Sequence, residues 1–208
     1  MKQIFSFFIC LLLVQFGMTQ TVVKDSVQKA KEDSIKMKKL EAILTYPLIN
    51  AGTFSGDVPV SNPDEIPDPA LNYKLLFELV DNNKANEAKD INHGLVEICR
   101  IINLHVASGI PVKNITPIIV VHGGALHSFY TRDIYQKKYN ADNPNIAIVD
   151  ELIKKTGARF IACGQAMNFF DVPREEMIPQ VKVSLTAQTV LSHYQLIGYK
   201  LYEIRDDK

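Results

Sequence analysis

The stretch from Gly157 to Gly164 reads Gly-Ala-Arg-Phe-Ile-Ala-Cys-Gly. Arg159–Cys163 has the apolar character of a buried strand, and the residues from Gly164 to Phe170 have the pattern of a turn and the first turns of a helix. In an open α/β sheet, ligands and chemistry collect just beyond the carboxyl ends of the strands. Cys163 is therefore expected to end a strand at the edge where such a fold carries its site.

Two interpretations of Cys163 remain open from these residues. A thiol at a helix N-terminus feels the positive end of the helix dipole, which favours the thiolate and a reactive role. Free cysteine is also among the most buried residue types, so Cys163 could equally be a small core residue at the end of a strand.

A second strand end points to the same edge. Pro117–Val121 is a short run of mostly β-branched residues, as in a buried parallel strand, and His122 follows it directly. Parallel strands place their carboxyl ends at one edge, so His122 is expected near Cys163, where an imidazole could set the protonation state of the thiol. The alternative is that His122 only orders its loop through a backbone hydrogen bond.

Four further residues complete the predicted site as substrate-binding positions: Gly123, Gly124, Gly164 and Gln165. The chain contains neither a Walker pattern nor Gly-x-Gly-x-x-Gly, so the glycine pair is better explained by a tight turn than by a phosphate loop. No cofactor is expected.

Strand patterns alternate with helix patterns along the second half of the chain. This order predicts a three-layer α/β sandwich with a mostly parallel five-stranded sheet and helices on both faces. The expected strands are Tyr73–Val80, Pro117–Val121, Arg159–Cys163, Val181–Val183 and Lys200–Ile204. The expected helices are Asn86–Ser108, Ala125–Tyr139, a segment from Pro144 that Gly157 closes, and Ala187–Ile197.

The beginning of the chain has the features of a secretory signal peptide. The apolar run Ile4–Phe16 follows a positive start, and small residues at Gly17 and Thr19 suit cleavage before Gln20. The run is short for a membrane span, which makes an uncleaved anchor the weaker alternative. Residues 1–19 are therefore predicted to be removed, leaving a secreted protein, with the periplasm as the expected compartment and no membrane association after cleavage.

Residues 20–70 are predicted to form a charged leader helix and a proline-rich arm ahead of a domain at 71–208. The stretch Val22–Leu44 combines many charges with a narrow apolar stripe, which fits a helix or a frayed leader. The prolines of Tyr46–Pro69 forbid regular helix or a central strand, so this arm is expected to lie over the domain or over a neighbouring subunit.

Composition and spacing exclude several functions. Lysine plus arginine and aspartate plus glutamate number 23 each, so no basic field is available for nucleic acid. After signal cleavage two cysteines remain, Cys99 and Cys163, too few for a disulfide scaffold, although a bond between them stays open without geometry. The spacing of Cys163, His122 and His127 matches no common zinc pattern, and no metal is predicted.

The chain resembles the DsrE/DsrF-like proteins, relatives of the sulfur-relay proteins of sulfur oxidation and tRNA thiolation. The resemblance covers roughly Leu71 to Ile204. It is carried by Lys74-Leu75-Leu76-Phe77, Val120-Val121-His122-Gly123, Phe160-Ile161-Ala162-Cys163-Gly164 with Met167, Ile178-Pro179-Gln180-Val181-Lys182-Val183, and Gln195-Leu196-Ile197-Gly198-Tyr199.

This resemblance implies a five-stranded parallel sandwich that assembles into trimers or hexamers. It also implies that Cys163 carries sulfur as a persulfide, in exchange with a donor or acceptor protein or a small thiol. The chain departs from the cytoplasmic relay proteins in its signal peptide, in its arm and in Gln165, where the family pattern would have asparagine.

The leading hypothesis is a secreted thiol protein, sulfurtransferase-like if active, in which Cys163 accepts sulfane sulfur or undergoes reversible oxidation. One alternative is a non-catalytic oligomeric binding or assembly module with a structural Cys163. The other is a small-ligand or metal pocket at the edge shared by His122 and Cys163.

Overall fold

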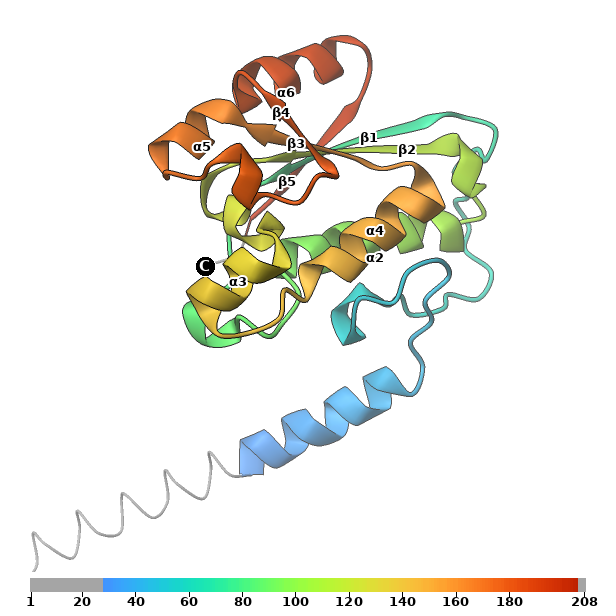
Figure 1. Cartoon of the computed structure of the whole chain (residues 1–208). Helices are drawn as coiled ribbons and strands as arrows, with labels where there is room; N and C mark the ends of the chain where they lie inside the picture. Colours follow the sequence, from blue (N-terminus) through green and yellow to red (C-terminus); the bar gives the residue numbers. More distant parts are fainter. Residues whose placement is uncertain (1–27, 206–208) are drawn as a thin grey trace, which may run out of the picture. The chain divides into compact units, whose positions relative to one another are not determined.

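The structure, a computed structural model, describes residues 28–205 (Figure 1). The chain divides into two compact units, Met1–Leu44 and Thr45–Lys208. In the first unit a helix spans residues 28–41, within the stretch expected to form a charged leader helix. The predicted signal peptide lies outside the described residues. Within residues 28–205, no helix is both long and apolar enough to cross a membrane.

The second unit is built on a five-stranded sheet in the order β4-β3-β2-β1-β5. Every pair of neighbouring strands is parallel, which confirms the predicted fold class. The strands are β1 (Tyr73–Leu79), β2 (Ile115–Val121), β3 (Arg159–Cys163), β4 (Val181–Ser184) and β5 (Lys200–Ile204).

Helices cover both faces of this sheet. They are α2 (His93–Ala107), α3 (Arg132–Tyr139), α4 (Asn145–Thr156), α5 (Gly164–Phe169) and α6 (Ala187–Leu196). Figure 1 shows α2 and α4 on one face and α6 on the other. The chain steps outward from β1 to β4 and then returns to place β5 beyond β1. Because parallel crossovers are right-handed, this reversal of direction brings α6 to the opposite face.

Alternation along the strands divides the core in two. Phe77 and Ile119 belong to the larger cluster beneath α2 and α4, whereas Leu76 and Ile118 belong to the smaller cluster that also contains Leu191 of α6. Successive side chains of a strand point to opposite faces, so continuously apolar strands supply both clusters.

The helix predicted for Asn86–Ser108 begins seven residues later in the structure, at His93. Helix α2 starts there because Asn92 caps it. The Asn92 Oδ1 atom accepts the N–H groups of Gly94 at 2.9 Å and Leu95 at 3.2 Å. A short 3-10 helix, Ala85–Glu87, occupies the residues before the cap.

The predicted helix Ala125–Tyr139 is two elements. A 3-10 helix spans Gly123–Phe129, and α3 starts only at Arg132. Between them Tyr130 is extended, with φ −63° and ψ 148°, and forms an antiparallel bridge with Met177. A backbone contact to a distant segment therefore interrupts the helix.

The first part of the proline-rich arm lies against α2 of the same chain. The buried side chain of Asn103 accepts the N–H groups of Leu48 and Ile49 and donates to the carbonyls of Ile49 and Ser55, at 2.7–3.1 Å. Ile49 is buried in the larger core cluster. These contacts attach the first part of the arm to α2 within the unit Thr45–Lys208.

Candidate functional site

His122 and Cys163 lie at one edge and on one face of the sheet. Their predecessors, Val121 and Ala162, are register partners and belong to the cluster on the α2 side. The His122 backbone remains extended, and its N–H donates to the Leu79 carbonyl at 3.1 Å. Both side chains therefore emerge on the α6 side, on strands about 4.8 Å apart.

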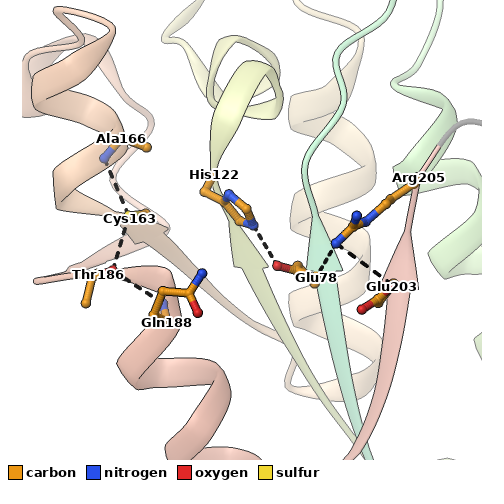
Figure 2. A network of polar contacts seen from close by, with 8 residues as sticks. All are labelled: Glu78, His122, Cys163, Ala166, Thr186, Gln188, Glu203 and Arg205. Atoms are coloured by element: carbon orange, nitrogen blue, oxygen red, sulfur yellow. Dashed lines mark hydrogen bonds and ion pairs between the residues drawn. The ribbon is translucent and has the colours of Figure 1, made fainter.

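Cys163 lies between the first turns of two helices. The Ala166 N–H of α5 donates to the Cys163 Sγ atom at 3.4 Å, and Sγ lies 4.0 Å from the Thr186 Oγ1 atom (Figure 2). Thr186 caps α6 by accepting the Gln188 N–H at 3.3 Å. Cys163 is 5% exposed. The sulfur is thus a buried group that already accepts a backbone N–H donor, as a thiolate would require.

Gly164 and Gln165 form the rim of this site. A Cβ atom on Gly164 would lie 2.7 Å from the Ser184 carbonyl oxygen, so only glycine fits this close approach of α5 to the end of β4. The Gln165 N–H donates to the Leu185 carbonyl at 3.2 Å, and its side chain is exposed. These contacts hold the first turn of α5 against the segment that leads into α6.

Gly123 and Gly124 shape the turn that follows β2. Gly123 has a φ of +59°, and a Cβ there would lie 3.0 Å from the Val80 carbonyl oxygen. The same carbonyl accepts the Ala125 N–H at 2.8 Å. Gly123 and Gly124 therefore form a tight turn against the Val80 carbonyl, as predicted.

The imidazole of His122 is hydrogen-bonded to a carboxylate that the sequence interpretation had missed. Its Nε2 atom lies 2.9 Å from the Glu78 Oε1 atom, and Figure 2 shows the ring directed toward Glu78 and away from Cys163. The Glu78 side chain is 8% exposed and also pairs with Arg205 at 3.4 Å. Arg205 in turn lies 3.9 Å from Glu203. A charged residue inside the apolar run of β1 was the signal that could have identified Glu78.

The two described cysteines lie on opposite faces of the sheet. Cys99 belongs to the core beneath α2, and Cys163 belongs to the cluster beneath α6. Both are free, so the possible disulfide between them is absent from this fold. Burial, with a smaller contribution from Glu151, raises the pKa of Cys99 to about 12.

His127 lies apart from the thiol, in an aromatic cluster. Its ring stacks on Tyr130 at 5.4 Å and meets the edge of Phe170 at 6.4 Å. Burial, and secondly the charge of Lys138, lower the pKa of His127. Among residues 28–205, no three His, Cys, Asp or Glu side chains are grouped closely enough to hold a metal ion.

The chain is similar to one protein family and to solved structures. The model of the DsrE/DsrF-like family matches residues 74–202, which include all the predicted site residues and Glu78. A similar solved structure is a protein of unknown function, MTH1491, from Methanobacterium thermoautotrophicum. It is 16% identical, with a TM-score of 0.46, and the match covers 63% of this chain and 98% of that one. No curated protein matches the chain. The family match spans more than half of the sequence, and the chain therefore belongs to the DsrE/DsrF-like family.

Proposed function

We propose that this DsrE/DsrF-like protein is a secreted, sulfurtransferase-like sulfur carrier in which Cys163 accepts sulfane sulfur as a persulfide and passes it on. The observation that carries the proposal is the position of Cys163. It ends β3 within the family match, and its sulfur accepts the Ala166 N–H at 3.4 Å. A donor at this distance stabilises negative charge on sulfur, both in the attacking thiolate and in the persulfide product.

The reaction is an exchange between sulfur atoms. The Cys163 thiolate attacks the outer sulfur of a donor persulfide, R–S–SH, and a new S–S bond forms as the R–S bond to that sulfur breaks. The bonding pair leaves with R–S⁻, which takes up the proton that Cys163 gave up. The sum is Cys163–SH plus R–S–SH giving Cys163–S–SH plus R–SH, without an external oxidant, in the manner of thiol–disulfide exchange.

Intact mass spectrometry after treatment with inorganic polysulfide tests the proposal. The expected product carries one additional sulfur atom, is absent from Cys163→Ala and is retained in the matched control Cys99→Ala. Two oxygen atoms have nearly the same mass as one sulfur, so the adduct must also release sulfide on treatment with dithiothreitol. An adduct that dithiothreitol does not remove would be a sulfinic acid and would contradict persulfide formation, and an adduct that Cys163→Ala retains would contradict the assignment to Cys163.

The secreted location rests on the sequence pattern of residues 1–19. Expression of the full chain in a Gram-negative host is expected to give a periplasmic protein whose N-terminus is Gln20. A cytoplasmic protein that keeps the apolar run would contradict this part of the proposal without affecting the chemistry of Cys163.

A second candidate is an assembly module in which Cys163 is structural. It is favoured by large apolar side chains exposed near the thiol, since Phe169 is 81% exposed and Leu185 is 75% exposed. Such side chains suit contact with other copies of the chain, and the proposed assembly is a trimer or hexamer. The two candidates share the assembly and differ only in whether Cys163 takes up sulfur.

A further inference from the structure

Glu78 is a carboxylate near the carboxyl end of the largely apolar strand β1. The residue as a whole is 6% exposed and stands between the buried residues Phe77 and Leu79 of β1, which is flanked by β2 and β5. Burial of a carboxylate is unfavourable unless the charge is paired and hydrogen-bonded. Glu78 meets this requirement through His122 at 2.9 Å and Arg205 at 3.4 Å.

The position of Glu78 links it to the thiol. Glu78 is the register partner of Val120, and both alternate with residues of the α2-side core, so Glu78 and His122 share the α6 side. Cys163 is on the same side, one strand beyond His122. Three neighbouring strands, β3, β2 and β1, thus present a thiol, an imidazole and a carboxylate along one edge (Figure 2).

We propose that Glu78 is the positioning residue of this site. Its carboxylate accepts the Nε2–H of His122, which fixes the imidazole and leaves Nδ1 as the atom that exchanges a proton. No described residue forms a hydrogen bond with Nδ1. This arrangement follows the general pattern of a nucleophile, a base and a third group that orients the base. Its consequence for sulfur transfer rests on the function proposed above.

The proton follows a closed path in this scheme. His122, whose ring is directed toward Glu78, takes up the proton of the Cys163 thiol through solvent, and the resulting imidazolium, bonded to Glu78, stabilises the thiolate from the adjacent strand. After the thiolate has attacked the donor persulfide, the imidazolium returns the proton to the departing R–S⁻. Glu78 keeps its charge throughout and acts only through His122.

The charged groups around Glu78 suggest an alternative to the positioning role, in which Glu78 is purely structural. Glu203 is its register partner on β5, Arg205 bridges the two carboxylates, and Asp81 lines one cavity together with Arg205. On the α6 side, the helix contributes the apolar or aromatic residues Ala187, Leu191 and Tyr194 to the adjoining cluster. Glu78 could therefore serve only to hold the end of β5 through Arg205.

The rate of Cys163 alkylation by iodoacetamide, followed by peptide mapping, separates these roles. Glu78→Gln keeps an acceptor for Nε2–H but removes the charge. We expect the midpoint of the pH–rate profile to move to higher pH and the rate near pH 7 to fall about fivefold, as the charge-assisted bond becomes neutral. The control Glu203→Gln loses a carboxylate that also faces Arg205 but does not touch His122, and it should retain the wild-type profile.

Equal profiles for the wild type and Glu78→Gln would overturn the proposal, as would equal shifts in both variants. If Glu78→Gln fails to fold, ¹⁵N NMR of the wild-type protein still tests the proposal, because it shows which nitrogen of His122 carries the proton. A neutral His122 with its proton on Nδ1 would contradict an Nε2–H donated to Glu78. The polysulfide experiment is independent of these readouts. A Glu78-dependent profile without persulfide formation would leave the positioning role and remove the sulfur-carrier function.

Discussion

Cys163 and Cys99 are both buried, yet their surroundings differ in one respect that matters for chemistry. Cys163 has a backbone N–H donor and a hydroxyl beside its sulfur, whereas Cys99 lies in an apolar core that raises its pKa to about 12. We expect iodoacetamide at about pH 8 to modify Cys163 in the native protein and Cys99 only after unfolding. Peptide mapping with and without urea measures this, and native labelling of Cys99 would contradict the packing described for α2.

Gly164 is constrained by the approach of α5 to β4. Gly164→Ala places a Cβ 2.7 Å from the Ser184 oxygen and is expected to lower the free energy of unfolding by about 1–3 kcal/mol. Gly124→Ala is the matched control, because the atoms nearest its Cβ lie at an ordinary 3.5 Å. Urea denaturation of both variants makes the comparison. Equal stability would mean that α5 can shift away from the sheet.

His127 makes the stability depend on pH. Its pKa is lowered in the folded protein, first by burial and then by Lys138, so the unfolded chain binds the proton more readily. The free energy of unfolding should therefore decrease as pH falls below about 6.5. His127→Gln should weaken this loss between about pH 7 and about pH 5.5, and Lys138→Gln should weaken it less. A variant with the full wild-type slope would show that other groups are responsible.

Asn103 attaches the arm to α2 through four hydrogen bonds. Asn103→Ala leaves buried N–H and carbonyl groups of the arm without partners, so the free energy of unfolding should fall by about 2 kcal/mol or more. Hydrogen exchange of Leu48–Ser55 should accelerate at the same time. Asn114→Ala, which removes one exposed bond to the Pro69 carbonyl, is the control and should change little. Unchanged exchange in Asn103→Ala would mean that other contacts, such as the packing of Ile49, hold the arm.

At the scale of elements, periodicity predicted the strands well and the helix limits less well. Apolar runs such as Pro117–Val121 need no knowledge of the rest of the chain to be identified as buried strands. The start of α2 depended on one cap, Asn92, whose Oδ1 atom stabilises two N–H groups and stops the helix there. The break at Tyr130 depended on Met177, which no local pattern connects with it.

At the scale of the molecule, the exposed apolar side chains near Cys163 provide a test of assembly. The combined substitutions Phe169→Asp and Leu185→Asp should lower the mass measured by light scattering after gel filtration, because they place charge on the proposed contact. Leu196→Asp, at an 87% exposed position on the end of α6, is the control and should leave the mass unchanged. A wild-type protein with the mass of one chain would contradict the proposed trimer or hexamer.

The succession of strands and helices, the parallel sheet and the edge shared by His122 and Cys163 can all be predicted from local sequence patterns. These features follow from local periodicity, from turn residues and from the rule that parallel strands end on one side. The strand order, in contrast, becomes known only from the folded chain; it places β5 beside β1 and so brings Arg205 to Glu78. The same is true of the hydrogen bond between Glu78 and the His122 imidazole, and of the hydrogen bonds by which Asn103 binds the arm. The reason is physical: each of these contacts joins residues far apart in the chain, and only the pairing of strands and the packing of helices brings them within hydrogen-bonding distance.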